Sequence, residues 1–130
     1  IATEIFDTDV MVPAVGQGIL SIELIDKEGH IVDLVKKLKD EPTKAAADAE
    51  RAFLIALGGG CNMPIAAYAQ ATETEITIEG VYATEDGKHF EKGTVKGNID
   101  NKKTLARTLA LDLKAKVENK QKAVLSDVTT

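Results

Sequence analysis

The sequence has few of the residues from which reactive and anion-binding sites are commonly built. Among 130 residues there is one cysteine, no tryptophan and only two histidines. This excludes an internal disulfide framework and any zinc cluster based on cysteines. Arginine is also scarce, since Arg51 and Arg107 are the only two. Because arginine is the side chain that best clamps carboxylates and phosphates, this chain alone is poorly equipped to hold a multiply charged anion.

The charge balance and the hydropathy exclude further classes of protein. Sixteen lysines and arginines stand against 21 aspartates and glutamates, giving a net charge of −5. Nucleic-acid binding relies on a basic surface, so we expect no nucleic-acid partner. No apolar run approaches the roughly 18 residues that a membrane span needs, so we expect no membrane partner and a cytoplasmic location. The first residue is Ile1 and no signal-peptide pattern follows, which predicts a piece of a longer protein.

The hydrophobic periodicity predicts an α+β domain: a three-stranded antiparallel sheet with helices on one face. Helices are expected at 31–38, from a cap at Thr43 to the glycines at 58–60, and at 102–118; strands are expected at 19–24, 65–70, 75–83 and 89–96. Asp86 and Gly87 indicate a hairpin turn before the last strand. Gly80 interrupts the alternation of its strand and predicts a bulge. The tail beyond Asn119 is expected to be weakly ordered.

Cys61 is the first candidate for chemistry. The preceding glycines at 58–60 leave room for a large group, but glycine also commonly ends a helix and a free cysteine is often a small buried hydrophobe. Both interpretations stay open. A conventional thiol nucleophile is disfavoured, because the preceding helix offers its negative C-terminal end. His30 and His89, the only possible imidazole bases, have no recognisable spacing to Cys61.

Other kinds of site fit poorly. Phosphate loops run from a strand into a helix N-terminus, whereas these glycines follow a helix. Two histidines and one cysteine at these separations match no metal-ligand pattern, so we expect no metal site. Asp48 and Glu50 are most simply interpreted as solvated charges on a helix surface.

Three segments, in this order, resemble the porphobilinogen deaminase (hydroxymethylbilane synthase) family. They are 12–23 (VPAVGQGILSIE), 49–54 (AERAFL) and 59–69 (GGCNMPIAAYA), and the resemblance extends over about residues 9–118. It implies the C-terminal part of a three-domain enzyme of tetrapyrrole (haem) biosynthesis. Residues 1–28 would be the connection from the second domain and the last strand of the first domain. Residues 29–130 would be the cofactor-attachment domain, with an ordered core at about 29–118.

The resemblance also implies roles for individual residues. Cys61 would hold a dipyrromethane cofactor through a thioether, with Gly59 and Gly60 giving it room in the loop. The cofactor would prime the addition of four porphobilinogens to give hydroxymethylbilane. Gln17 would help shape the active-site cleft, or else satisfy a tight turn. Arg51 would pair with a cofactor carboxylate, or else form a structural salt bridge.

The resemblance places the arginine-rich cleft and the catalytic aspartate in the missing first and second domains. No catalytic residue is therefore expected in this fragment, which alone is expected to be inactive. The alternative is a non-enzymatic α+β interaction module with a buried structural cysteine. In either case the apolar run at 19–24 would promote self-association of the fragment. A carrier domain needs Cys61 accessible and modified, whereas an interaction module is indifferent to its replacement by alanine.

Overall fold

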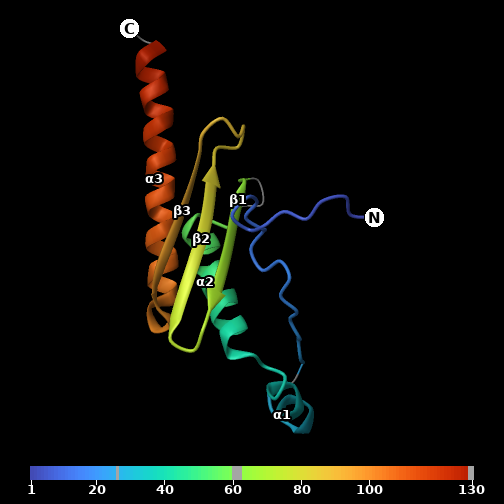
Figure 1. Ribbon diagram of the computed structural model, residues 1–130. Coiled ribbons are helices and arrows are strands. Elements are labelled where there is room, and N and C mark those ends of the chain that lie inside the picture. The colour runs from blue at the N-terminus through green and yellow to red at the C-terminus, as the bar shows by residue number, and fades with distance from the viewer. Residues whose placement is uncertain (26, 60–62, 129–130) are drawn as a thin grey trace.

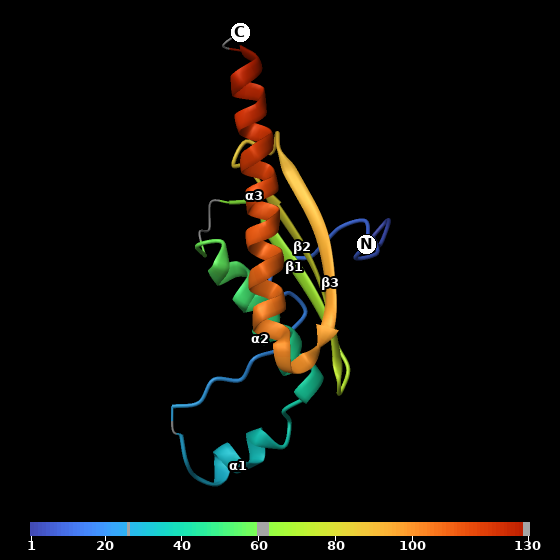
Figure 2. The ribbon, with the colours of Figure 1, turned by 90° about the vertical axis from the view of Figure 1, so that its left-hand side faces the viewer.

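The computed structural model describes residues 1–25, 27–59 and 63–128. Its elements are α1 (His30–Lys36), α2 (Glu41–Ala56), β1 (Ile65–Ala71), β2 (Glu75–Ala83), β3 (Phe90–Asn98), the 3-10 turn η1 (Ile99–Asn101) and α3 (Lys102–Val128). The strands form one antiparallel sheet in the order β1-β2-β3. Helices α2 and α3 cover the same face of this sheet, and α1 lies apart from that layer (Figures 1 and 2). The expected α+β fold is confirmed.

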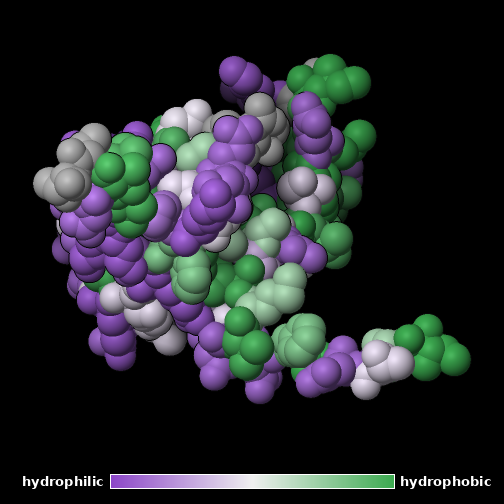
Figure 3. All heavy atoms as spheres, turned by 90° about the horizontal axis from the view of Figure 1, so that it is seen from above, coloured by the Kyte–Doolittle hydropathy of each residue, from purple (hydrophilic) through white to green (hydrophobic). Residues whose placement is uncertain are grey.

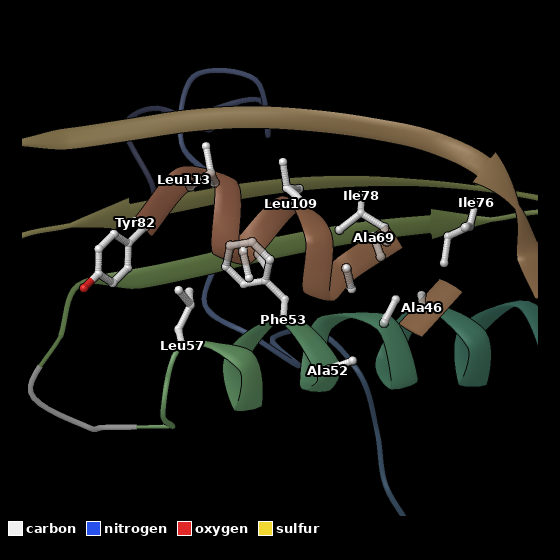
Figure 4. Packing of buried hydrophobic residues seen from close by; sticks show 14 of the residues in the cluster. Ala46, Ala52, Phe53, Leu57, Ala69, Ile76, Ile78, Tyr82, Leu109 and Leu113 are labelled. Carbon is white, nitrogen blue, oxygen red and sulfur yellow. The ribbon is translucent and has the colours of Figure 1, made fainter. Parts of the chain in front are cut away.

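The core lies between the sheet and the two covering helices (Figure 4). Its largest fully buried side chains are those of Phe53, Ile76, Ile78, Leu113 and Val117. Alternate residues of the strands face this core, as the two-residue period of a strand requires. The opposite face carries the polar positions of β2 and β3, where Lys92 pairs with Glu79 at 2.6 Å.

The expected bulge at Gly80 is wrong. Both sheet ladders run through this residue without a break, because Gly80 pairs with Ala67 on one side and Gly93 on the other. The reason for the glycine lies in the helix layer. A Cβ at this position would come within 2.5 Å of the ring of Phe53, so the absence of a side chain lets α2 approach the sheet.

Two expected helix boundaries are also corrected. Helix α2 begins at Glu41, because the carboxylate of Asp40, and not Thr43, caps it by accepting from the Thr43 N–H at 3.0 Å. Pro42 then lies in the first turn, where a missing N–H costs nothing. Helix α3 runs to Val128, beyond the expected end at 118. All its buried residues lie between Ala106 and Val117, so its last turns project past the sheet (Figure 1).

The expected strand at 19–24 is wrong in this structure. These residues have no regular secondary structure. A strand needs a hydrogen-bonded neighbour, and no described strand pairs with this run. Leu20, Ile22 and Leu24 are consequently exposed. The N-terminal end of the chain extends away from the body (Figure 1), and the view from above shows a narrow arm of mixed hydrophobic and hydrophilic residues projecting from it (Figure 3). Across the described residues, we find no helix with the length and apolar character needed to span a membrane.

Candidate functional site: the loop after helix α2

The loop between α2 and β1 begins with a helix-ending motif built on glycine. The Gly58 N–H donates to the carbonyl of Ile55 and the Gly59 N–H to that of Leu54, both at 3.0 Å. Gly58 and Gly59 have φ values of 92° and 62°, in the left-handed region that favours glycine. This pair of bonds is the Schellman arrangement. The glycine run therefore does end the helix, as one of the two interpretations of this segment expects.

The same two glycines border open space. A Cβ added at Gly58 or Gly59 would meet no atom within 4 Å, and both residues are exposed. The expected site residues Gly60 and Cys61 lie outside the described residues. The described flanks thus leave room for a bulky group in the loop, as the other interpretation requires.

Both ends of the loop are fixed to the core. Leu57 is buried before it, and Met63 and Ile65 pack against the core after it. Figure 4 shows Leu57 and Tyr82 at the end of the core next to the loop. The described flanks of the loop are therefore anchored in the core at this end of the helix-sheet layer.

Gln17 lies in a tight turn that its own side chain helps to close. Its Oε1 accepts from the Ala14 N–H at 3.3 Å, and its N–H donates to the Ala14 carbonyl at 3.0 Å. Gly16 and Gly18 have positive φ values of 75° and 82°. Gln17 borders a hollow of about 470 Å³ together with Glu50 and Tyr68. The described residues of the loop after α2 do not line this hollow.

The expectation for Glu50 is wrong. Glu50 is buried, with 3% of its surface exposed, and is not a solvated charge. Its Oε2 accepts from the Gly16 N–H at 2.7 Å and its Oε1 from the Ala69 N–H at 2.9 Å. The helical periodicity of the sequence predicts this burial, because position 50 falls on the same stripe of α2 as buried Ala46, Phe53 and Leu57.

The charges on the outer surface of the helices are arranged differently. Asp48 pairs with Lys44 at 2.7 Å, and this hydrogen bond lowers the pKa of Asp48. Arg51 and Arg107 are exposed. In the described part of the chain neither guanidinium forms an ion pair, so the structural salt bridge considered for Arg51 is not observed there.

The two histidines lie far apart in the fold. His30 begins α1, and the backbone N–H of His89 donates to Thr84 Oγ1 at 3.2 Å in the turn between β2 and β3. Within residues 1–25, 27–59 and 63–128, no group of three or more histidine, cysteine, aspartate or glutamate side chains could hold a metal ion.

Comparisons with known proteins point to one family. A family profile described as "Porphobilinogen deaminase, C-terminal domain" matches residues 44–115. The chain is 39% identical over 114 residues to the porphobilinogen deaminase of Gloeobacter violaceus, covering 87% of this chain and 35% of that protein. It is 40% identical over 96 residues to the porphobilinogen deaminase of Pelotomaculum thermopropionicum, covering 74% of this chain and 31% of that protein. The chain thus spans about a third of the length of the curated relatives it matches.

Proposed function

Since the chain belongs to the porphobilinogen deaminase family, we propose that it is the cofactor-carrying part of a longer enzyme of tetrapyrrole biosynthesis. The matched profile is that of the C-terminal domain. The missing partners in this proposal are the first and second domains of the same enzyme, which we place in the cytoplasm. Residues 1–28 would connect to those domains, and residues 29–130 would form the attachment domain.

The observation that carries the proposal is the open loop after α2. The sole cysteine of the chain, Cys61, follows directly on Gly58–Gly60. The described glycines of this run are exposed, and a Cβ at either would meet nothing within 4 Å. Its two ends are held by buried or half-buried side chains. A thiol that follows uncrowded glycines in the sequence, between two flanks that pack against the core, suits the attachment of a large group.

In the proposed function Cys61 holds a dipyrromethane, which supplies the primer that four further porphobilinogens extend to hydroxymethylbilane. The attachment needs a thioether bond from the Cys61 sulfur to the aminomethyl carbon of porphobilinogen. That carbon loses its nitrogen as ammonia, and the thiol proton is released.

The same proposal assigns catalysis to the rest of the enzyme. The growing product carries many carboxylates, and carboxylates are best bound by arginine. This chain has only Arg51 and Arg107, which lie exposed on separate helices. We therefore expect the isolated chain not to catalyse the condensation.

Two assays with porphobilinogen test this proposal. The longer enzyme should form hydroxymethylbilane, and Cys61→Ser should abolish this activity while leaving the fold intact. Asn62→Ser, a change at the adjacent position of the same loop, serves as the matched control and should retain activity. Turnover by the 130-residue chain alone at enzyme-like rates would contradict the assignment of catalysis to the first and second domains. Full activity of Cys61→Ser would contradict the attachment role of Cys61 and leave this domain as an interaction module within the enzyme.

A further inference from the structure

Glu50 is the one charged side chain that is buried among the described residues. A carboxylate loses its hydration on burial, and this is unfavourable unless hydrogen bonds replace the water. Within residues 1–25, 27–59 and 63–128 no lysine or arginine forms an ion pair with it. Its charge is therefore compensated by hydrogen-bond donors alone.

These donors come from two segments that are far from α2 in sequence. One is the Gly16 N–H, 34 positions earlier, and the other is the Ala69 N–H of β1, 19 positions later. Each donates to a different oxygen of the carboxylate, and hydrogen bonds to a charged acceptor are about twice as strong as neutral ones. Glu50 thereby joins α2, β1 and the turn at 14–18.

The position of β1 explains why such a link is needed. β1 is an edge strand, with β2 on one side only. The turn at 14–18 forms no ladder with it, so the carboxylate provides the connection between the two backbones. Both glycines of the turn have positive φ and open space around them. Val15 of the same turn packs against the core, and the bond from Gly16 to Glu50 adds the hydrogen bond that fixes the turn's backbone to the domain.

We propose that Glu50 is a positioning residue that fixes the turn carrying Gln17 to the domain carrying Cys61. The proposal rests on the proposed function and on the first of the two roles that the family resemblance implies for Gln17, which is to help shape the active-site cleft. Glutamate is required because two N–H groups must be accepted at once. Glutamine offers one acceptor oxygen and an NH₂ group that opposes the second donor. Aspartate keeps the charge but is one methylene shorter.

Hydrogen–deuterium exchange of the longer enzyme tests the structural part. Glu50→Gln and Glu50→Ala should each raise the exchange rate of the peptide over residues 14–19 by about tenfold or more. Protection of the central strand around Ile76 and Ile78 should be retained in Glu50→Gln, which keeps the shape of the side chain. Glu73→Gln, an exposed site in the turn between β1 and β2, is the matched control and should change neither. Unchanged exchange over 14–19 in both Glu50 variants would overturn the proposal.

A double-mutant cycle on turnover tests the positioning role itself. Gln17→Ala and Glu50→Gln should each lower kcat more than they change KM. Their combination should be hardly worse than either alone, because both act through the same turn. Additive losses, or wild-type turnover in Gln17→Ala, would overturn the positioning role. The mass of the Cys61 peptide, measured on the same samples, reports separately on the proposed function, because an unmodified wild-type cysteine would refute cofactor attachment without altering the exchange result.

Discussion

The ring of Phe53 occupies the space that a side chain at Gly80 would need. A Cβ on Gly80 would lie 2.5 Å from Cε2 and 2.6 Å from Cζ of that ring. Phe53 is fully buried, so a ring displaced by a new side chain would have to move against the rest of the core. The contact fixes how closely α2, the helix that leads into the Cys61 loop, lies on the sheet.

Gly80→Ala should therefore destabilise the domain by about 1–3 kcal/mol, as overpacked cores usually do. Urea unfolding followed by circular dichroism measures this change. Thr77→Val is a suitable control, because it alters a side chain of similar size on the opposite face of the same strand and should stay within about 0.5 kcal/mol. A wild-type midpoint for Gly80→Ala would show that the helix does not pack as described.

Two leucines two positions apart on α3 should respond very differently to truncation. Leu113 is 1% exposed and Leu111 is 55% exposed. Leu113→Ala should cost about 2–5 kcal/mol, because it removes buried methyl groups and leaves a cavity. Leu111→Ala should cost less than about 0.5 kcal/mol. Equal losses of unfolding free energy in the two variants would contradict the helix orientation.

The cap of α2 should make stability depend on pH in the acidic range. Hydrogen bonds from the Thr43 hydroxyl and N–H lower the pKa of Asp40 from its usual value of 3.8. A lowered folded-state pKa means that the stabilisation is fully present above the unfolded-state pKa. It is lost as the pH falls through the lower folded-state value.

Asp40→Asn separates the charge from the cap. Asparagine is also a good helix cap but does not titrate. This variant should therefore keep the helix and lose the contribution of Asp40 to the pH dependence of stability. Asp40→Ala should lower the thermal midpoint at pH 7, and the difference from wild type should shrink as the pH drops below about 4. A difference that stays constant down to pH 2 would contradict the role of the charge.

Most of the fold could be predicted from the sequence, because the apolar periods of α2, α3 and the strands reflect real burial. The run at 19–24 shows the limit of such patterns. Its β-prone residues satisfy the local preference for a strand, but a strand also needs a neighbour to pair with. Gly80 shows a second limit. A side chain there would clash with the ring of Phe53, which lies on a helix and 27 positions earlier in the sequence.

Only part of the candidate site could be predicted from the sequence, for similar reasons. The glycine-rich loop is evident in the sequence because glycine has a local conformational signature. Glu50 was missed because its chemical type suggests exposure, whereas its helical phase places it on the buried stripe with Phe53. Its two partners are backbone groups, which have no signature in the sequence.

The central claim is that Cys61 carries the primer of tetrapyrrole assembly. The most direct test is the mass of the tryptic peptide covering residues 52–88, which lies between Arg51 and the next basic residue, Lys88, and contains the sole cysteine. In the longer enzyme purified after expression, the account predicts this peptide with the added mass of two porphobilinogen units less two ammonia molecules. The Cys61→Ser variant should give the bare peptide. A wild-type peptide of unmodified mass, with a thiol that alkylates freely, would contradict the account.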